Sequence, residues 1–373
     1  MKLLLIFGTR PEAIKLAPVY LEAKRRGHEV EVLTTGQHTD LLDEVISFYD
    51  IKVDYPLQLE RKGKSLANLY SVLINSIDES LMSKDYDWVL VHGDTASTFA
   101  GSFVAFLLQI KIAHVEAGLR SGNKYSPFPE ELNRKFVGQL ADLHFSPTIT
   151  AAENLKMEGV PPMKVFNVGN TVIDAVLETQ ELTRLDTYNI SEKLKVILDT
   201  LGKRGKIHLI TAHRRENWGK GILDICDAIN ELSTRYPDDI FLFSAHSNKE
   251  LRKLIEERLI NNENIMLTGS FAYPDFVYLL NNAHTILSDS GGVQEECFIL
   301  KKRLLVLREV TERPEVLQSP SIRLCGTKKS TIIDSFVSLY SEELFDYNNF
   351  ALGKGVTSKL ILEKLENYEE GLC

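Results

Sequence analysis

The sequence is short of cysteine, of long apolar runs and of basic charge, and each shortage excludes a class of protein. The 373 residues contain 4 cysteines, which are too dispersed for a disulfide framework or a CxxC-type zinc site. No apolar run approaches the roughly 18 residues that span a bilayer, and the apolar start at Met1–Phe7 has no cationic leader. The net charge of −9 argues against a nucleic-acid-binding surface but allows a local cationic pocket. We therefore expect a soluble cytoplasmic protein with no membrane or nucleic-acid partner. Its thiols, which we expect to be reduced, are Cys226, Cys297, Cys325 and Cys373.

Short β-rich runs alternate with longer helical patterns along the whole chain, which predicts βαβ units and parallel sheets covered by helices. In the first half the expected strands are Lys2–Phe7, Glu29–Thr34, Asp87–His92, Lys111–Val115 and Leu143–Ser146. The expected helices there are Pro11–Arg26, Ser65–Met82, Thr95–Leu108 and Pro129–Ala141. In the second half the expected strands are Ile207–Thr211, Ile240–Ser244, Asn264–Thr268, Thr285–Ser288 and Arg303–Leu307. The expected helices there are Trp218–Tyr236, Lys249–Leu259, Pro274–Asn281 and Gly292–Leu300.

The length and the two series of strands predict two domains. The polar stretch Glu178–Ser191 has little hydrophobic periodicity and is the expected linker. We expect a Rossmann-like doubly wound domain at 1–178 and a second at 191–355, with the active site in the cleft between them. Residues 356–373 include a helical pattern that we expect to pack back on the first domain.

A glycine turn after the first strand has the features of an anion site. The run GTRPE at residues 8–12 combines a tight turn with Pro11 at the first helical position. The free N–H groups of the helix start, with Arg10 and Lys15 nearby, would attract a phosphate. The run matches neither GxGxxG nor a Walker A loop. An ordinary helix N-terminus with solvated cations explains the local pattern equally well.

A second glycine turn follows the fourth expected strand of the second half. In SDSGGVQEE, residues 288–296, Ser290 and the amides of Gly291 and Gly292 would hold a phosphate without obstruction by side chains. Glu296 lies one turn further on, where it can accept hydrogen bonds from ribose hydroxyls. One such junction in each half favours a nucleotide-sugar ligand over two plain helix starts.

Three carboxylates are the expected acid and base groups. Asp94 and Glu116 follow neighbouring strands, and Glu130 opens a helix. If they share a partly dry site, their repulsion raises some pKa values, which provides both a proton donor and a base near neutrality. Asp94 and Glu116 could instead form a metal site with His92 and His114, but the spacing lacks a complete HExxH-type signature.

A histidine followed by two arginines ends the first expected strand of the second domain. His213 can hydrogen-bond a diphosphate or protonate a leaving oxygen, while Arg214 and Arg215 can pair with phosphate oxygens. The position at a strand end favours a functional role over a structural one.

Seven ordered motifs resemble those of the non-hydrolysing UDP-N-acetylglucosamine 2-epimerases, a family with the GT-B fold. They are GTRPEAIKLAP, VLVHGDT, HVEAGLRSGNKYSPFPEELNR, VGNTVIDA, TAHRREN, SDSGGVQEE and TERPE. The resemblance implies interconversion of UDP-GlcNAc and UDP-ManNAc for surface polysaccharide biosynthesis. The reaction eliminates UDP to leave 2-acetamidoglucal and then adds it back with inversion at the second carbon, without a metal or another cofactor.

The resemblance also implies roles for individual residues and a homodimer. The catalytic group would be Asp94, Glu116, Glu130 and His213. The substrate-binding group would be Arg10, Lys15, Arg214, Phe271, Ser290, Gly291, Gly292, Glu296 and Arg313. Which carboxylate removes the proton stays open.

The chain departs from the family pattern at several positions. Gln37 and His246 are candidate residues of an allosteric UDP-GlcNAc site, but Asp40 stands where glutamine is usual and Gly63 where arginine is usual. Phe271 replaces a frequent glutamine near the expected uracil pocket. These departures bear on activation and on the exact sugar.

Three other functions fit the same motifs. They are a 2-epimerase of a related UDP-N-acetylamino sugar, whether hydrolysing or not, a GT-B glycosyltransferase, and a nucleotide-sugar sensor that does not turn over. Release of free sugar, dependence on an acceptor, or tight UDP binding without reaction would distinguish them. The presence of all four candidate catalytic residues argues against the sensor.

Overall fold

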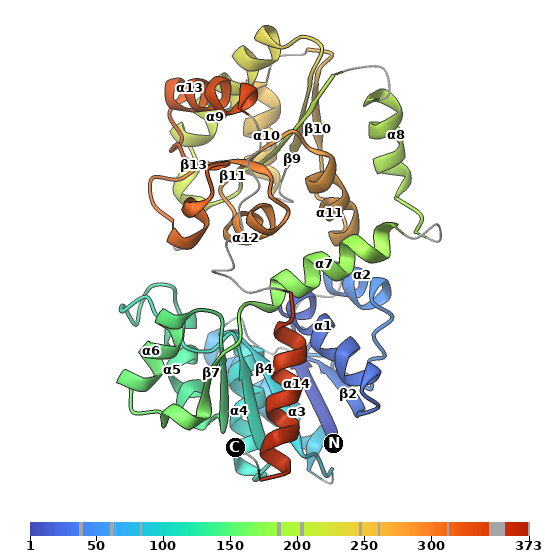
Figure 1. The fold of residues 1–373 in the computed structure, drawn as a ribbon, viewed down its shortest axis with the longest axis vertical. Helices are drawn as coiled ribbons and strands as arrows, with labels where there is room; N and C mark the ends of the chain where they lie inside the picture. Colours follow the sequence, from blue (N-terminus) through green and yellow to red (C-terminus); the bar gives the residue numbers. More distant parts are fainter. Residues whose placement is uncertain are drawn as a thin grey trace. The chain divides into compact units, whose positions relative to one another are not determined.

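The computed structural model describes residues 1–36, 40–59, 63, 65–82, 84–184, 188–201, 205–245, 248–259, 262–311, 313–342 and 355–371. The chain forms two compact units (Figure 1), Met1–Glu178 with Leu352–Cys373, and Thr179–Ala351. Each unit is built on one parallel sheet.

The first unit has a seven-stranded parallel sheet in the order β3-β2-β1-β4-β5-β6-β7. Its strands are β1 (Lys2–Phe7), β2 (Glu29–Thr34), β3 (Tyr55–Pro56), β4 (Trp88–His92), β5 (Lys111–Val115), β6 (Leu143–Ser146) and β7 (Val165–Asn167). Its helices are α1 (Arg10–Arg25), α2 (Asp40–Phe48), α3 (Leu66–Leu81), α4 (Ala96–Leu107), α5 (Glu130–Leu140), α6 (Ile149–Met157), a 3-10 turn at Pro162–Lys164, α7 (Thr171–Arg184) and α14 (Thr357–Glu369).

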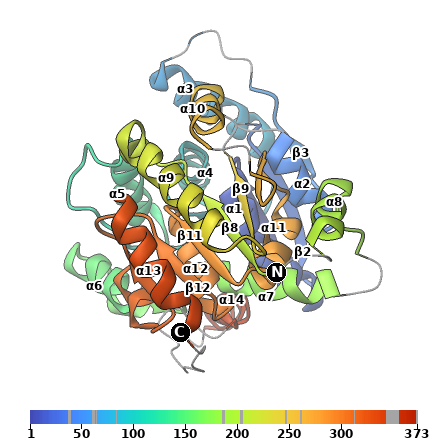
Figure 2. The ribbon, with the colours of Figure 1, turned by 90° about the horizontal axis from the view of Figure 1, so that it is seen from above.

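The second unit repeats the plan with six parallel strands in the order β10-β9-β8-β11-β12-β13. The strands are β8 (Ile207–Thr211), β9 (Ile240–Ser244), β10 (Ile265–Thr268), β11 (Thr285–Ser288), β12 (Arg303–Val306) and β13 (Ile322–Leu324). The helices are α8 (Glu192–Leu201), α9 (Lys220–Arg235), α10 (Lys249–Arg258), α11 (Tyr273–Asn282), α12 (Gly291–Ile299) and α13 (Lys329–Ser341), with 3-10 turns at Arg215–Asn217 and Pro314–Gln318. Figure 2 shows α9 and α13 side by side in this unit.

The central strands form because their side chains are almost continuously apolar. Leu3–Phe7 of β1 and every residue of β4 are buried, as expected for strands covered by helices on both faces. In each sheet the strand order reverses once, between β1 and β4 and between β8 and β11. Open α/β sheets bind ligands at such a reversal. The predicted α/β fold with two doubly wound units is confirmed.

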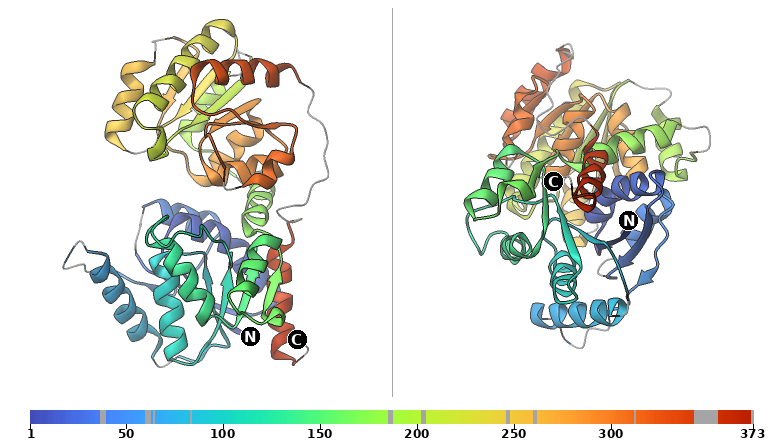
Figure 3. Two further views of the ribbon diagram at one scale, coloured as in Figure 1. Left: turned by 90° about the vertical axis from the view of Figure 1, so that its left-hand side faces the viewer. Right: turned by 60° about the horizontal axis from the view of Figure 1, so that its bottom comes forward.

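The C-terminal helix α14 belongs to the first unit and packs against α1 (Figure 3). The Asp174 carboxylate of α7 accepts hydrogen bonds from the backbone N–H groups of Thr357 and Ser358 at 3.2 and 2.8 Å. Glu366 pairs with Arg26 at 2.7 Å. These contacts attach α14 to α7 and to the end of α1.

The expected linker differs from the structure in its first part, because α7 continues through Arg184. The stretch from Glu178 is rich in Glu, Gln and Leu, which favour helix even without a strong apolar period. The sequence reading also missed α8 and the short edge strands β3, β7 and β13. Among the described residues, no helix combines the length and apolar character needed to cross a membrane.

Candidate active site

The turn after β1 is held to the turn after β4 by one buried carboxylate, Glu12. Its Oε2 accepts hydrogen bonds from the backbone N–H groups of Gly8 and Thr9 at 3.1 and 2.8 Å. Its Oε1 accepts from the hydroxyls of Thr95 and Thr98 at 2.6 and 3.1 Å. Burial raises the pKa of Glu12, although the hydrogen bonds oppose that shift. Glu12 therefore joins the two loops at the reversal of the first sheet.

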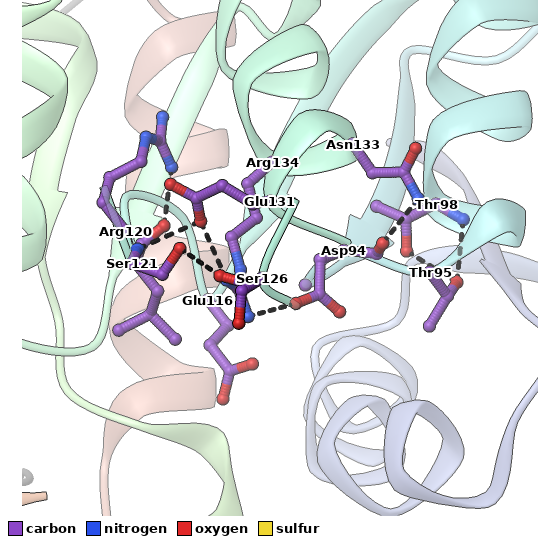
Figure 4. A network of polar contacts seen from close by, with 12 residues as sticks. Asp94, Thr95, Thr98, Glu116, Arg120, Ser121, Ser126, Glu131, Asn133 and Arg134 are labelled. Carbon is purple, nitrogen blue, oxygen red and sulfur yellow. Dashed lines mark hydrogen bonds and ion pairs between the residues drawn. The ribbon is translucent and has the colours of Figure 1, made fainter. Parts of the chain in front are cut away.

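Asp94 lies in the second of these loops and pairs with Arg134 of α5 (Figure 4). The Arg134 Nη2 is 2.5 Å from Asp94 Oδ2, and Asn133 Nδ2 donates to the Asp94 carbonyl at 2.8 Å. Burial raises the pKa of Asp94, Arg134 lowers it, and the charges of Glu116 and Glu130 raise it again. The net shift is upward, which suits a group that carries a proton during catalysis.

Glu116 follows β5 with its backbone in the left-handed region, at φ 62°. For a residue with a Cβ this conformation costs roughly 1–2 kcal/mol. Lys15 forms an ion pair with the Glu116 carboxylate, in which both side chains are 13% exposed. His92 Nε2 lies 3.8 Å from Glu116 Oε2, and Asn170 Nδ2 donates to Oε1 at 3.4 Å. Asp50, Gln109 and Lys301 share this backbone conformation, but Glu116 combines it with the ion pair to Lys15, and such strain at a group of charged residues is typical of a functional position.

The two adjacent glutamates at the start of α5 have different surroundings. Glu131 is fully buried and accepts hydrogen bonds from the backbone N–H of Ser121 at 3.0 Å and from Arg134 at 3.0 Å. Burial alone would raise the pKa of Glu131, but these donors lower it. Glu130 is half-buried at the helix start, close enough for its charge to raise the pKa of Asp94. The structure thus brings Asp94, Glu116 and Glu130 together and gives Glu131 a structural role.

The histidines of the first sheet are neutral in the folded protein. Burial lowers the pKa of His92 and of His114 to about 4. His114 Nε2 is hydrogen-bonded to the Gly93 carbonyl at 2.8 Å. Within the described residues, no three His, Cys, Asp or Glu side chains are arranged to hold a metal ion.

In the second unit, Asp289 holds the loop that follows β8. Its side chain is fully buried, and its oxygens accept hydrogen bonds from the backbone N–H groups of His213 and Arg214 at 3.0 and 2.9 Å. Asn217 Nδ2 donates to Asp289 Oδ2 at 2.9 Å. The His213 ring is 38% exposed beside this carboxylate.

The second glycine turn opens α12 as the sequence predicts, with Ser290 before the first helical residue. A Cβ on Gly291 would lie 3.2 Å from Arg313 Cζ, whereas a Cβ on Gly292 would meet nothing within 4 Å. The Arg313 guanidinium therefore lies against the turn, where Glu295 accepts from its Nε at 2.8 Å. Glycines, a helix start and a fixed arginine form an anion site.

Other predicted residues are placed as follows. Arg10 is the first residue of α1, and Glu296 is buried within α12. The Phe271 ring is buried, and Lys193 Nζ lies 3.8 Å from its centroid. The candidate allosteric residues Gln37 and His246 lie outside the described residues, as do the side chains of Asp40 and Arg215.

Sequence reasoning missed Glu12, Arg134 and Asp289 as residues that organise the site. Each lies within or beside a quoted motif: Glu12 ends GTRPE, and Asp289 precedes Ser290. For Glu12 and Asp289, the available signal was an acidic residue within a glycine turn motif. The contacts that make these three residues important join positions 40 to 86 apart in the chain, and motif spacing does not reveal such contacts.

The fold and site define a GT-B-type α/β enzyme with acidic groups at one sheet reversal and an anion-binding turn at the other. A family model described as UDP-N-acetylglucosamine 2-epimerase matches residues 21–366. The chain belongs to this family, as its motifs predicted. It is 43% identical to the UDP-N-acetylglucosamine 2-epimerase of Neisseria meningitidis over 98% of this chain and 99% of that one.

Solved structures agree with this assignment. A structure of the Neisseria meningitidis enzyme bound to UDP-GlcNAc matches with a TM-score of 0.87 and 42% identity, covering 98% of this chain and 100% of that one. A Methanocaldococcus jannaschii UDP-GlcNAc 2-epimerase in complex with UDP-GlcNAc and UDP has a TM-score of 0.80 at 32% identity, covering 98% and 99%.

Proposed function

We propose that the chain is a non-hydrolysing epimerase that interconverts UDP-GlcNAc and UDP-ManNAc for surface polysaccharide biosynthesis. The observation that carries this proposal is the group of Asp94, Glu116 and Glu130, in which the Asp94 pKa is raised while Glu116 is ion-paired with Lys15. A carboxyl group with a raised pKa close to a charged carboxylate is suited to giving and taking a proton at a carbon. The relatives named above, which include enzymes crystallised with UDP-GlcNAc or UDP, support the substrate.

The proposed chemistry balances without an external oxidant or acceptor. Departure of UDP carries away the electron pair of the bond between the first sugar carbon and oxygen. A carboxylate takes the proton of the second carbon, and the electron pair of that bond forms the carbon–carbon double bond of 2-acetamidoglucal. On the return path UDP adds to the first carbon, and a carboxylic acid protonates the second carbon on its opposite face. We assign Glu116 and Asp94 to these exchanges, with Glu130 stabilising the cationic character that develops on the sugar.

The second unit has groups suited to a diphosphate. The amides of Gly291 and Gly292 at the start of α12, together with Ser290 and Arg313, are suited to phosphate oxygens. His213 and Arg214 lie on the loop fixed by Asp289. Arg10 would add charge, Glu296 would accept from ribose hydroxyls, and Phe271 would border the uracil. The predicted cleft between the domains and the predicted allosteric site stay predictions.

Product analysis tests this proposal. The chain is incubated with UDP-GlcNAc, and the sugars are separated and identified. We expect a mixture of UDP-GlcNAc and UDP-ManNAc in which UDP is conserved. Stoichiometric release of free ManNAc and UDP would identify a hydrolysing enzyme instead, and an absolute need for an acceptor would identify a glycosyltransferase.

We propose that the protein is a homodimer that uses the face formed by α3, α4 and α5, helices that pack on one another. Large apolar side chains are exposed there, including Phe106 at 54%, Leu107 at 58% and Phe136 at 49%. Exposed apolar side chains on neighbouring helices favour an interaction surface, and the occupant that we propose is the same face of a second copy.

We infer that the protein acts in the cytoplasm. Cys226 and Cys297 are free and buried, and Cys325 is free. Burial raises the pKa of the Cys226 and Cys325 thiols to about 12. Unpaired, inert thiols fit a reducing compartment.

A further inference from the structure

Asp289 has contacts that go beyond supporting a loop. Its Oδ1 lies 3.4 Å from Nδ1 of the His213 ring, in addition to the hydrogen bonds that it accepts from the backbone. The carboxylate is fully buried, while the imidazole is 38% exposed. One side of the ring thus faces the buried Asp289 carboxylate.

The carboxylate is fixed independently of the ring. The backbone N–H of Arg214 and Nδ2 of Asn217 both donate to Oδ2 at 2.9 Å. Asn217 is itself anchored by a second hydrogen bond from its Nδ2 to the Leu307 carbonyl at 3.2 Å. With Oδ2 held by these donors, Oδ1 has a defined position beside the imidazole.

We propose that Asp289 is a positioning residue that keeps a proton on Nδ1 of His213 and stabilises its imidazolium form. This proposal rests on the proposed epimerase function. A carboxylate beside Nδ1 fixes the tautomer of a histidine and favours its charged state. His213 then donates the Nε2 proton to the departing diphosphate oxygen, which receives the electron pair of the broken bond. It remains neutral with its proton on Nδ1 and recovers the Nε2 proton when UDP returns.

An asparagine in place of Asp289 separates its support of the loop from its effect on the His213 ring. In Asp289→Asn the amide oxygen takes the place of Oδ2, because Arg214 N–H and Asn217 Nδ2 both donate there. The amide nitrogen then faces Nδ1 of His213 as a donor and favours the opposite tautomer. The His213 backbone N–H lies 3.1 Å from Oδ1 and 3.0 Å from Oδ2, so it keeps the oxygen at the Oδ2 position as its acceptor. The loop then keeps its shape, but the ring carries its proton on the wrong nitrogen.

A double-mutant cycle tests the proposal. We expect D289N to lower kcat about 10-fold or more while KM for UDP-GlcNAc stays within about 2-fold. In a His213→Asn background the same change should alter kcat less than about 2-fold, because the ring on which Asp289 acts is gone. An equal loss in both backgrounds would overturn the proposal and leave Asp289 as loop support only. Inactivity of the wild-type chain would instead contradict the proposed function, so the two failures are distinguishable.

The second unit offers a matched control in Asp239, which also contacts a histidine. Asp239 Oδ2 lies 3.1 Å from Nε2 of the fully buried His208, at the opposite end of the strands from His213. Asp239→Asn should change thermal stability without changing kcat. A loss of kcat in D239N as large as that in D289N would show that any disturbed Asp–His pair impairs turnover, which would contradict a specific role for Asp289.

A measurement on the wild-type protein avoids dependence on variant folding. Ring 15N chemical shifts of labelled histidine, assigned with H213N, report which nitrogen carries the proton. We expect Nδ1 of neutral His213 to be protonated. A neutral ring protonated on Nε2 would overturn the proposal even if D289N failed to fold.

Discussion

Lys15 is ion-paired with Glu116, and Glu116 has a left-handed backbone at φ 62°. The ion pair and the turn act in opposite directions on stability, because the pair favours the folded state and the backbone strain opposes it. A residue that is kept in spite of strain is expected to serve activity more than stability.

Two substitutions separate the strain from the ion pair. Both Glu116→Ala and Glu116→Gly remove the carboxylate, but only glycine adopts a positive φ without a steric cost. We expect E116G to be more stable than E116A, with a free energy of unfolding that is higher by about 1 kcal/mol. Urea denaturation measures this difference. Both should lack turnover. Greater stability of E116A would show that the turn is not strained.

Asp94→Asn removes a titratable group from the acidic cluster and preserves its shape. We expect kcat to fall by about 10²- to 10⁴-fold, while UDP affinity measured by calorimetry stays within about 2-fold. Unchanged turnover would refute a role for Asp94 in proton exchange. Glu153→Gln, which alters an exposed carboxylate on α6, serves as the control and should leave kcat unchanged.

The buried histidines make stability depend on pH. Burial lowers the pKa of His92 and of His114 to about 4, and that of His144 to about 3, from 6.5. The unfolded chain therefore binds more protons below about pH 6.5, so the free energy of unfolding falls as pH drops from there toward about pH 4. His114→Gln should flatten this fall, as measured by urea denaturation across the range. A profile as steep as that of the wild type would show that His114 titrates normally in the fold.

Asp239 also makes the protein less stable in acid, but at a lower pH than the buried histidines do. Hydrogen bonds from His208, Lys206 and Tyr340 outweigh burial and lower the Asp239 pKa from 3.8 to about 2. The stability that these bonds contribute is present above about pH 3.8 and is lost as pH falls through about 2. Asp239→Asn should therefore lower the melting temperature near neutrality more than near pH 2. An equal loss at both pH values would contradict this interpretation.

The exposed apolar face of the first unit provides a prediction on assembly. Phe136→Glu places a charge on α5 within the proposed dimer surface, where its burial against a second copy would be unfavourable. Light scattering should show a dimer for the wild type and a monomer for the variant. Met157→Glu alters a side chain on α6 that is 78% exposed and should remain dimeric. A monomeric wild type would exclude the proposed assembly.

The sheet centres could be predicted from the sequence because apolar residues dominate the short strands β1, β4, β5, β8 and β9. The edge strand Tyr55–Pro56 could not be predicted, because a half-buried residue followed by an exposed one carries no periodic signal. The polar end of α7 also lacked one, since its helix depends on intrinsic propensity.

Within the site, residue types at strand ends identified Asp94, Glu116 and His213. The partners of these residues required the folded chain: Lys15, which the resemblance implies binds substrate, contacts Glu116 across 101 positions. Asp289 reaches the His213 backbone across 76 positions. Such pairings depend on which strands become neighbours, and local pattern does not determine that.

The central claim is that the chain exchanges the proton on the second sugar carbon through reversible loss of UDP. The most direct measurement is NMR of UDP-GlcNAc incubated with the protein in heavy water. The account predicts deuterium at the second carbon of both UDP-GlcNAc and UDP-ManNAc as they reach equilibrium. Formation of UDP-ManNAc with the original hydrogen retained, or no exchange while UDP binds, would contradict it.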